Sequence, residues 1–375
     1  MTENPFIITE KVIPKYFCDR ESESAELIKL LTNGNNVVLI SPRRLGKTGL
    51  IQFCYEQKVI KQDYLTIYVD ILSTTNLQEF TYLLGREVFD RVKNSGKGMW
   101  RVFLNVVKSL SGKIGFDPLS GLPMLNIQLG DISRPDYTLK EIFDYLDQAP
   151  KKCILAIDEF QQIRNYPEKN VEALIRSHIL QINNCRLIFS GSEKHILSDM
   201  FLNSRRPFYQ SASFIELRVI PSDIYIDFIR RMFKQHEKKI SSDLSLKIYE
   251  MFEGVTFFIQ RVCNGVFANT DNESEATEET LQWTIDGIMN SYDMIYRLNM
   301  SQLTTKQKEL LIAIAKERSA RKITSVDFIH KYSLSSASSI QTALKSLLKN
   351  NIVAKKDDYY FIEDIFLRLW IERNY

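Results

Sequence analysis

A short apolar run that leads into a loop ending in Gly-Lys-Thr constrains this chain more than any other feature. Val37-Val38-Leu39-Ile40 has the β-branched character of a buried strand, the loop covers Ser41 to Thr48, and a helix-compatible segment begins at Gly49. A strand, a loop and a helix in this order are the context that a phosphate-binding loop requires. The sequence therefore predicts an α/β fold with a phosphate-binding loop at the end of a strand.

The residue types in the loop match the groups that a nucleotide presents. Gly46 lets the backbone approach a phosphate, and Lys47 supplies a charge for the β- and γ-phosphates of ATP. Thr48 supplies a hydroxyl for Mg²⁺, and the N–H groups at the start of the helix are donors for phosphate oxygens. The expected nucleotide contacts are Ser41, Pro42, Arg43, Arg44, Leu45, Gly46, Lys47, Thr48 and Gly49. Ser41 replaces the first glycine of the usual pattern, so a strict pattern search would miss this loop.

A second motif supplies the acidic groups of a nucleotide site. The strand-like run Cys153–Ile157 ends in Asp158-Glu159, and neighbouring side chains of a strand point in different directions. Asp158 is expected to join Thr48 in the Mg²⁺ shell, and Glu159 to orient or deprotonate the water that attacks the γ-phosphate. The alternative is that Lys47 merely ends a loop and the acidic pair caps the next helix. The two motifs together favour nucleotide binding.

Further polar residues are candidates for contact with the γ-phosphate. The strand 185–190 ends in Ser190-Gly191-Ser192, where either serine can sense the phosphate or instead form a turn that caps the next helix. Arg43-Arg44 and Arg205-Arg206 are the candidate additional cations. A guanidinium near the γ-phosphate stabilises the transition state and can come from a neighbouring subunit. Arg205 and Arg206 precede the last expected strand, where an arginine finger and a solvated or structural role are the alternatives.

Length and composition bound the class of protein. A chain of 375 residues suggests two or three domains, and 44% hydrophobic residues suffice for a sizeable core. Five scattered cysteines without a Cys-x-x-Cys pair argue for a reducing compartment, which we expect to be the cytoplasm, and against structural zinc. No apolar run approaches the length of a membrane span, and the polar start is not a signal peptide.

The order of apolar patterns predicts three parts. Strand patterns at 37–41, 65–70, 153–158, 186–190 and 213–217 alternate with helical ones, which is typical of a parallel sheet covered by helices on both faces. We expect a P-loop core at 1–220, with an insertion at about 95–136 that contains a helix at 99–110 and a hairpin at 122–129. A helical part follows at 221–300. Residues 301–375 read as three helices and two short strands, a winged helix-turn-helix.

Taken together, these motifs and several shorter ones resemble a known family. The shared pieces are Asn4-Pro5-Phe6, Tyr16-Phe17, Arg20-Glu21, Glu23, Ala25, the loop 41–48, Asp158-Glu159-Phe160-Gln161, Ser190-Gly191-Ser192, Pro207-Phe208-Tyr209, Glu363-Asp364, Phe366 and Trp370. The chain resembles the archaeal-type P-loop ATPases, a branch of the STAND class related to AAA+ proteins. The resemblance implies an α/β P-loop NTPase core (AAA+/ASCE-like), a helical lid and a winged helix.

The resemblance also implies roles for single residues. In the family the segment that corresponds to Tyr16–Glu21 lies near the adenine, which implies nucleotide contacts for Phe17 and Arg20. Members often carry Gly-Arg where this chain has Gln210-Ser211, so that arginine's role is absent or moved to Arg205-Arg206. The STAND lid commonly carries a Gly-x-Pro that touches the nucleotide, and Gly254-Val255-Thr256 stands in its place.

Three functions are compatible with these features. The leading one is a Mg²⁺-dependent ATPase that works as a nucleotide-driven switch. The second is an ATP-gated DNA-binding regulator, for which Lys345 and Lys355-Lys356 would meet DNA. Residues 301–375 hold 13 basic against 8 acidic residues, which is a reason to consider DNA. The expected recognition helix 337–347 carries only one cation, Lys345, which is few for a module that neutralises several phosphates, so packing or a partner protein is favoured there over DNA. The third is a signalling scaffold that forms homo-oligomers through its ATPase domain.

Overall fold

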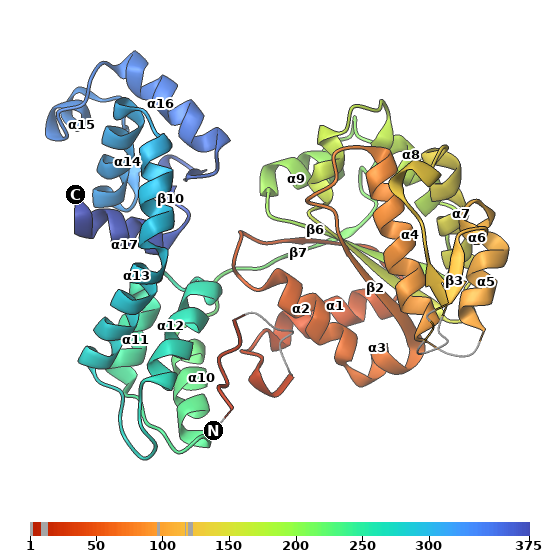
Figure 1. Ribbon diagram of the computed structural model, residues 1–375, viewed down its shortest axis with the longest axis horizontal. Coiled ribbons are helices and arrows are strands. Elements are labelled where there is room, and N and C mark those ends of the chain that lie inside the picture. Colours follow the sequence, from red (N-terminus) through yellow and green to blue (C-terminus); the bar gives the residue numbers. More distant parts are fainter. Residues whose placement is uncertain (1–2, 9–13, 96–97, 117, 119–122) are drawn as a thin grey trace. The chain divides into compact units, whose positions relative to one another are not determined.

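Five of the apolar runs form one parallel sheet. The computed structural model describes residues 3–8, 14–95, 98–116, 118 and 123–375 (Figure 1). The strands of this sheet are β1 (Val37–Ile40), β2 (Tyr64–Asp70), β5 (Lys152–Asp158), β6 (Cys185–Gly191) and β7 (Ser213–Glu216). They lie in the order β2-β5-β6-β1-β7, and every neighbouring pair is parallel. The prediction of a parallel sheet is confirmed. Its carboxyl edge brings together the ends of β1, β5 and β6, where open α/β sheets bind their ligands.

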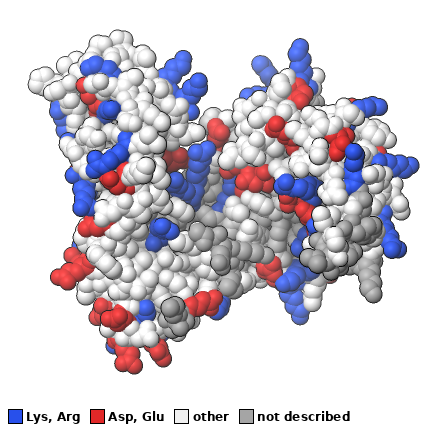
Figure 2. Space-filling model, viewed as in Figure 1, with Lys and Arg blue, Asp and Glu red and all other residues white. Residues whose placement is uncertain are grey.

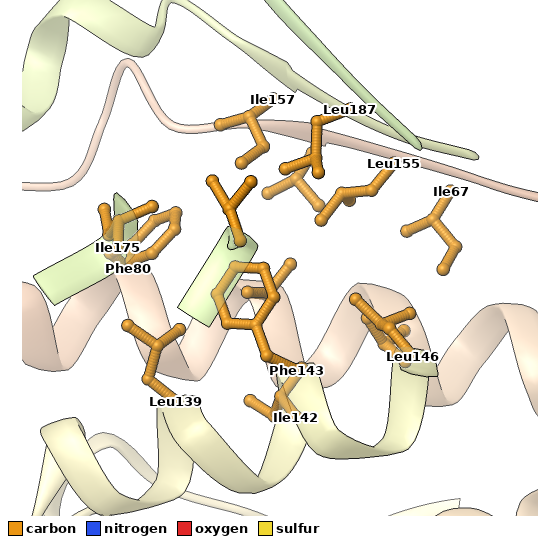
Figure 3. Packing of buried hydrophobic residues seen from close by; sticks show 14 of the residues in the cluster. Ile67, Phe80, Leu139, Ile142, Phe143, Leu146, Leu155, Ile157, Ile175 and Leu187 are labelled. Carbon is orange, nitrogen blue, oxygen red and sulfur yellow. The ribbon is translucent and has the colours of Figure 1, made fainter. Parts of the chain in front are cut away.

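Alternation along the strands produces two apolar layers. Val37 and Leu39 pack with one layer, which includes helices α1 (Glu21–Thr32), α2 (Lys47–Glu56) and α3 (Lys58–Asp63). Val38 and Ile40 pack with the other layer, on α4 (Leu77–Lys93), α7 (Pro135–Gln148), α8 (Val171–Ile179) and α9 (Lys194–Leu202). Figure 3 shows this second layer, in which strand residues such as Leu155 and Ile157 face Phe143 of α7. Both faces of the sheet are therefore buried, which explains why its strands read as continuous apolar runs.

The insertion differs from the prediction in two ways. The expected helix 99–110 is interrupted, with α5 (Met99–Val106) and α6 (Lys108–Ser111) meeting at Val107, whose backbone is not helical. The predicted hairpin within 122–129 is wrong, because β4 (Pro123–Leu125) pairs antiparallel with the earlier β3 (Ile114–Phe116), and a 3-10 helix, η2 (Leu129–Asp131), follows. Leu122, where that hairpin was expected to begin, lies outside the described residues. A pairing partner that precedes the strand cannot be read from the local pattern of 122–129.

The contact pattern divides the chain into two units. The P-loop unit holds residues Ile7–Phe228 and Gly254–Phe257, and the helical unit holds Met1–Phe6, Ile229–Glu253 and Phe258–Tyr375. The helices that follow the sheet are α10 (Ser222–Gln235), α11 (Ser242–Met251), α12 (Thr256–Ala268) and α13 (Glu278–Gln302), as the sequence predicted. Two of them, α10 and α12, contribute residues to both units. No helix in the described part of the chain is long and apolar enough to cross a membrane.

The winged helix lies within the helical unit. It contains α14 (Thr305–Glu317), β8 (Ala320–Arg321), α15 (Val326–Lys331), α16 (Ala337–Lys349), β9 (Val353–Lys356), β10 (Tyr359–Ile362) and α17 (Ile365–Asn374). The predicted strand pair is confirmed, and β8 joins it as a third strand that the sequence analysis did not predict. Trp370 of α17 is buried, and its Nε1 donates to Oδ1 of Asp293 on α13 at 2.8 Å. Figure 2 shows basic and acidic side chains interspersed on the face in view.

Candidate nucleotide-binding site

The phosphate-binding loop has the backbone that its sequence implies. Gly46 has φ +91°, in the left-handed region that favours glycine, and α2 begins at the next residue. The first N–H groups of α2 have no carbonyl partner one turn earlier within the helix, so they form an anion site. Ser41 is buried and has no positive φ. A serine is therefore tolerated where the usual pattern has glycine.

The two sequence motifs meet at the carboxyl edge of the sheet. Lys47 Nζ lies 2.8 Å from Asp158 Oδ1 and 2.9 Å from Glu159 Oε1, and all three side chains are largely buried. Burial by itself would raise the pKa of each carboxyl, but the Lys47 ammonium and several hydrogen bonds hold both pKa values below their usual range. Both carboxylates are therefore ionised at neutral pH, and Lys47 is held at the mouth of the loop.

An oxygen pair suited to Mg²⁺ forms beside this cluster. Thr48 Oγ1 donates to Asp158 Oδ2 at 3.2 Å, and Tyr68 Oη of β2 donates to the same oxygen at 2.6 Å. No group of three His, Cys, Asp or Glu side chains that could hold a metal occurs among the described residues. Mg²⁺ in phosphate sites takes one or two protein oxygens, with water and substrate phosphates as its other ligands. Thr48 and Asp158 fit that requirement.

Glu159 is held by its backbone and by three side chains. Its φ of +55° is left-handed, a strained conformation for a glutamate, and such strain clusters at functional sites. Besides the contact with Lys47, its Oε2 accepts from Ser192 Oγ at 2.9 Å and from Gln161 Nε2 at 2.5 Å. The side chain of Glu159 makes no capping hydrogen bond to the 3-10 helix η3 (Phe160–Asn165) that follows. Helix capping therefore does not explain this carboxylate.

Both serines at the end of β6 contact the acidic pair. Ser190 is fully buried, and its Oγ donates to Asp158 Oδ1 at 2.6 Å. Ser192 contacts Glu159, as described above. The N-cap position of α9 is Glu193, so neither serine caps this helix. The cap alternative is excluded for both, and a role in sensing the γ-phosphate stays a prediction.

Arg20 contacts the phosphate-binding loop, and Phe17 packs on the helix that follows it. Arg20 is buried, pairs with Glu23 at 2.7 Å and donates to the carbonyl oxygen of Leu45 within the loop at 3.2 Å. Phe17 stacks on Phe53 of α2 with ring centroids 4.3 Å apart. Arg20 therefore stabilises the phosphate-binding loop through the carbonyl of Leu45. The adenine contact of Phe17 and Arg20 stays a prediction.

The four candidate arginines have different surroundings. Arg206 forms ion pairs with Asp199 at 2.9 Å and with Glu172 at 3.4 Å, so its guanidinium is engaged within the P-loop unit. Arg205 is exposed, and no side-chain ion pair of Arg205 occurs in the described part of the chain. Arg43 and Arg44 are exposed on the loop, and the Arg44 guanidinium lies 5.3 Å from the ring centroid of Phe257. The surroundings distinguish Arg205 from Arg206, which the sequence could not.

Sequence reasoning missed two residues of the site. Tyr68 contacts Asp158 because β2 is the neighbour of β5, and Gln161 contacts Glu159 because η3 turns back toward the end of the sheet. The signal for Tyr68 was a polar aromatic inside a buried strand. For Gln161 the signal was a polar amide side chain that follows the acidic pair Asp158-Glu159 closely in the sequence. Neither signal indicates a partner until the strand order is known.

Comparisons with known proteins identify the class of protein. Residues 17–262 match the family described as ATPase domain predominantly from Archaea, and residues 294–373 match a winged helix domain family. A Walker-type ATPase of Pyrococcus abyssi superposes with a TM-score of 0.62 at 20% identity, covering 98% of this chain and 99% of that one. No curated protein sequence matches the chain.

Two archaeal Orc proteins have the same fold. The Orc2 protein of Aeropyrum pernix, solved with ADPNP and ADP, has a TM-score of 0.59 at 15% identity over 99% of this chain and 96% of that one. The Orc1 protein of the same organism, solved in complex with DNA, has a TM-score of 0.56 at 11% identity over 99% and 96%. The fold and site thus define a nucleotide-binding P-loop ATPase with a winged helix. The chain belongs to the family of ATPase domains found predominantly in Archaea.

Proposed function

We propose that this protein hydrolyses ATP with Mg²⁺ and acts as a nucleotide-driven switch. The observation that carries the proposal is that the two sequence motifs meet at one sheet edge. Lys47 contacts Asp158 at 2.8 Å and Glu159 at 2.9 Å, and Thr48 contacts Asp158 at 3.2 Å. These are the phosphate, metal and water-activating groups that phosphoryl transfer to water requires. Family membership supports the same reaction.

Each residue has one task in this proposal. Lys47 and the N–H groups of the loop bind the phosphate oxygens. Thr48 and Asp158 would hold Mg²⁺, which would neutralise phosphate charge. An ammonium that pairs with phosphate leaves Oε1 of Glu159 available to a water molecule. The Glu159 carboxylate then accepts a hydrogen bond, and then the proton, from the attacking water.

The start of α12 supports the switch part of the proposal. The backbone N–H of Phe257 donates to the carbonyl oxygen of Arg44 in the loop at 3.0 Å. Thr256 and Phe257 belong to the P-loop unit, whereas the rest of α12 belongs to the helical unit. A rearrangement of the loop on nucleotide exchange is therefore transmitted along one helix into the second unit. In this proposal α12 is the element whose position the nucleotide biases.

Two substitutions separate binding from chemistry. K47M is expected to weaken ATP binding strongly, because it removes the charge that pairs with the phosphates. E159Q is expected to bind ATP normally but to lose about 100-fold or more in turnover, since an amide cannot accept the proton. E193Q, which changes an exposed carboxyl group after β6, is the matched control and should behave as wild type. Turnover of E159Q near the wild-type rate would contradict the assigned mechanism.

Arg205 is the candidate finger for a neighbouring subunit. It is exposed at the approach to β7, whereas Arg206 is held by Asp199 and Glu172. A guanidinium supplied in trans raises turnover only when subunits assemble. R205A should therefore lower turnover at protein concentrations where light scattering detects ATP-dependent assembly and leave turnover of the monomer unchanged. Equal loss at all concentrations would refute a role in trans.

An ATP-gated DNA-binding role is the second candidate. Helix α16 exposes Gln341, Thr342 and Lys345, which are groups that contact bases and phosphates, and the neighbouring strand pair exposes Lys355 and Lys356. The small excess of basic residues in 301–375, 13 against 8 acidic, predicts only weak binding. Affinity for duplex DNA should then depend on ATP and fall steeply with salt. A variant of the three lysines should lose this affinity, whereas K108A, in the P-loop unit, should not. Absence of binding at low salt would exclude this candidate.

A further inference from the structure

Gln161 is an unusual residue to find beside Glu159. It is 4% exposed, and its Nε2 donates to Oε2 of Glu159. Its Oε1 is buried and has no hydrogen-bond partner among the described residues. An unpaired buried amide oxygen is destabilising, and an apolar side chain of the same length would avoid that penalty. The contact with Glu159 is the one hydrogen bond in the described structure that the Gln161 side chain makes.

Gly191 provides the space that Gln161 occupies. A Cβ added to Gly191 would lie 2.0 Å from Gln161 Oε1, well inside van der Waals contact. Gly191 has no positive φ, so its backbone does not itself require glycine. Leu197 Cδ1 would lie 2.8 Å from the same Cβ, so the last residue of β6 is small because both side chains approach it, with Gln161 much the nearer. Through this contact the position of the amide depends on the end of β6, which also carries Ser190 and Ser192.

We propose that Gln161 is a positioning residue that holds the Glu159 carboxylate in its reactive orientation, with Gly191 as the support on which the amide rests. With Oε2 held by Gln161 and Ser192, Oε1 is turned toward Lys47 and the phosphate-binding loop. The left-handed backbone of Glu159 sets the direction of the side chain, and the two donors set its rotation. The catalytic part of this inference rests on the proposed ATPase function, whereas the structural part does not.

The first test replaces the amide by an apolar group of similar length. Q161M removes the donor to Glu159 and the unpaired oxygen together. We expect kcat to fall about 10- to 100-fold, because a hydrogen bond to a charged group is lost at the reacting centre. KM for ATP and Kd for ADP should stay within about twofold, and Tm should be unchanged or higher. A merely structural role would instead lower Tm and change kcat and KM together.

The second test uses the contact with Gly191. G191A is expected to displace the amide and lower kcat as Q161M does. In the Q161A background there is no amide to displace and only the flexible end of Leu197 must shift, so the double variant Q161A/G191A should have nearly the kcat of Q161A alone. A G191A effect of equal size in both backgrounds would show that Gly191 acts independently of Gln161, and it would overturn the supporting role.

A crystal structure of Q161M tests the inference without using activity. We expect the Glu159 carboxylate to leave its place between Lys47 and Ser192. If it keeps both contacts, or if Q161M retains wild-type kcat while E159Q is inactive, the inference is overturned. If wild-type protein fails to hydrolyse ATP but Glu159 moves in the Q161M crystal, the proposed ATPase function fails and the positioning contact stands.

Discussion

Tyr68 offers a sharp test of the metal site, because one hydroxyl group can be removed without changing the packing. Its Oη donates to Asp158 Oδ2 at 2.6 Å and lies 3.4 Å from Thr48 Oγ1, so it touches both proposed Mg²⁺ ligands. Burial and the charge of Asp158 raise the pKa of Tyr68. The hydroxyl therefore keeps its proton and remains a donor at any pH at which the protein is studied. Y68F removes only this donor.

The expected magnitude follows from two independent estimates. Loss of a hydrogen bond to a charged group costs about 1.5–3 kcal/mol. Loss of an outer partner of a metal ligand weakens metal binding about 10- to 100-fold, which corresponds to about 1.4–2.8 kcal/mol. Because Asp158 is only 3% exposed, water cannot readily replace the donor. Y68F should therefore raise the Mg²⁺ concentration for half-maximal turnover about 10- to 100-fold and leave kcat at saturating Mg²⁺ within about threefold.

The assay is a Mg²⁺ titration at saturating ATP, with Y55F as the matched control. Tyr55 is also a buried tyrosine that donates to β2, but its acceptor is the carbonyl oxygen of Ile67 at 2.9 Å, away from the carboxylates. Y55F should lower Tm and leave the Mg²⁺ dependence unchanged. The assignment of Asp158 as a metal ligand is wrong if Y68F has the wild-type Mg²⁺ dependence, or if Y55F shifts it as much.

Three further predictions concern the surroundings of the site. R206A should lower Tm by about 2–4 °C with little effect on ATP binding, because Arg206 pairs with Asp199 away from the loop. A large loss of turnover at unchanged Tm would instead favour Arg206 as the arginine finger. R20M should lower the free energy of unfolding by about 1.5–3 kcal/mol and weaken nucleotide binding, because the carbonyl of Leu45 loses its donor. Denaturant unfolding and calorimetry measure the two effects, and unchanged nucleotide affinity would contradict the support of the loop by Arg20. Burial raises the pKa of Cys54 to about 12, so at pH 8 only about one Cys54 thiol in 10⁴ is a thiolate. Ellman's reagent should therefore react with Cys54 slowly in native protein and rapidly in guanidinium. Rapid reaction in the native protein would contradict the burial of Cys54.

Local patterns predicted the parts of the molecule that depend on neighbours in sequence. The strands of the sheet, the phosphate-binding loop and the helices α10 to α16 were predicted correctly, because period and turn chemistry are local properties. The prediction failed in the insertion, where β4 pairs with a strand that precedes it rather than with residues that follow. It also missed β8 and α17, which are short or fully packed against other elements.

By itself the sequence determined the class of the protein: Gly46-Lys47-Thr48 after one strand and Asp158-Glu159 after another permit few folds and predict a nucleotide site. Only the tertiary structure decided which side chains surround those motifs. The order β2-β5-β6-β1-β7 brings Tyr68 to Asp158, and the turn after β5 brings Gln161 to Glu159 and Gly191. The physical reason is that strand order results from the packing of segments far apart in the chain, which no local pattern encodes.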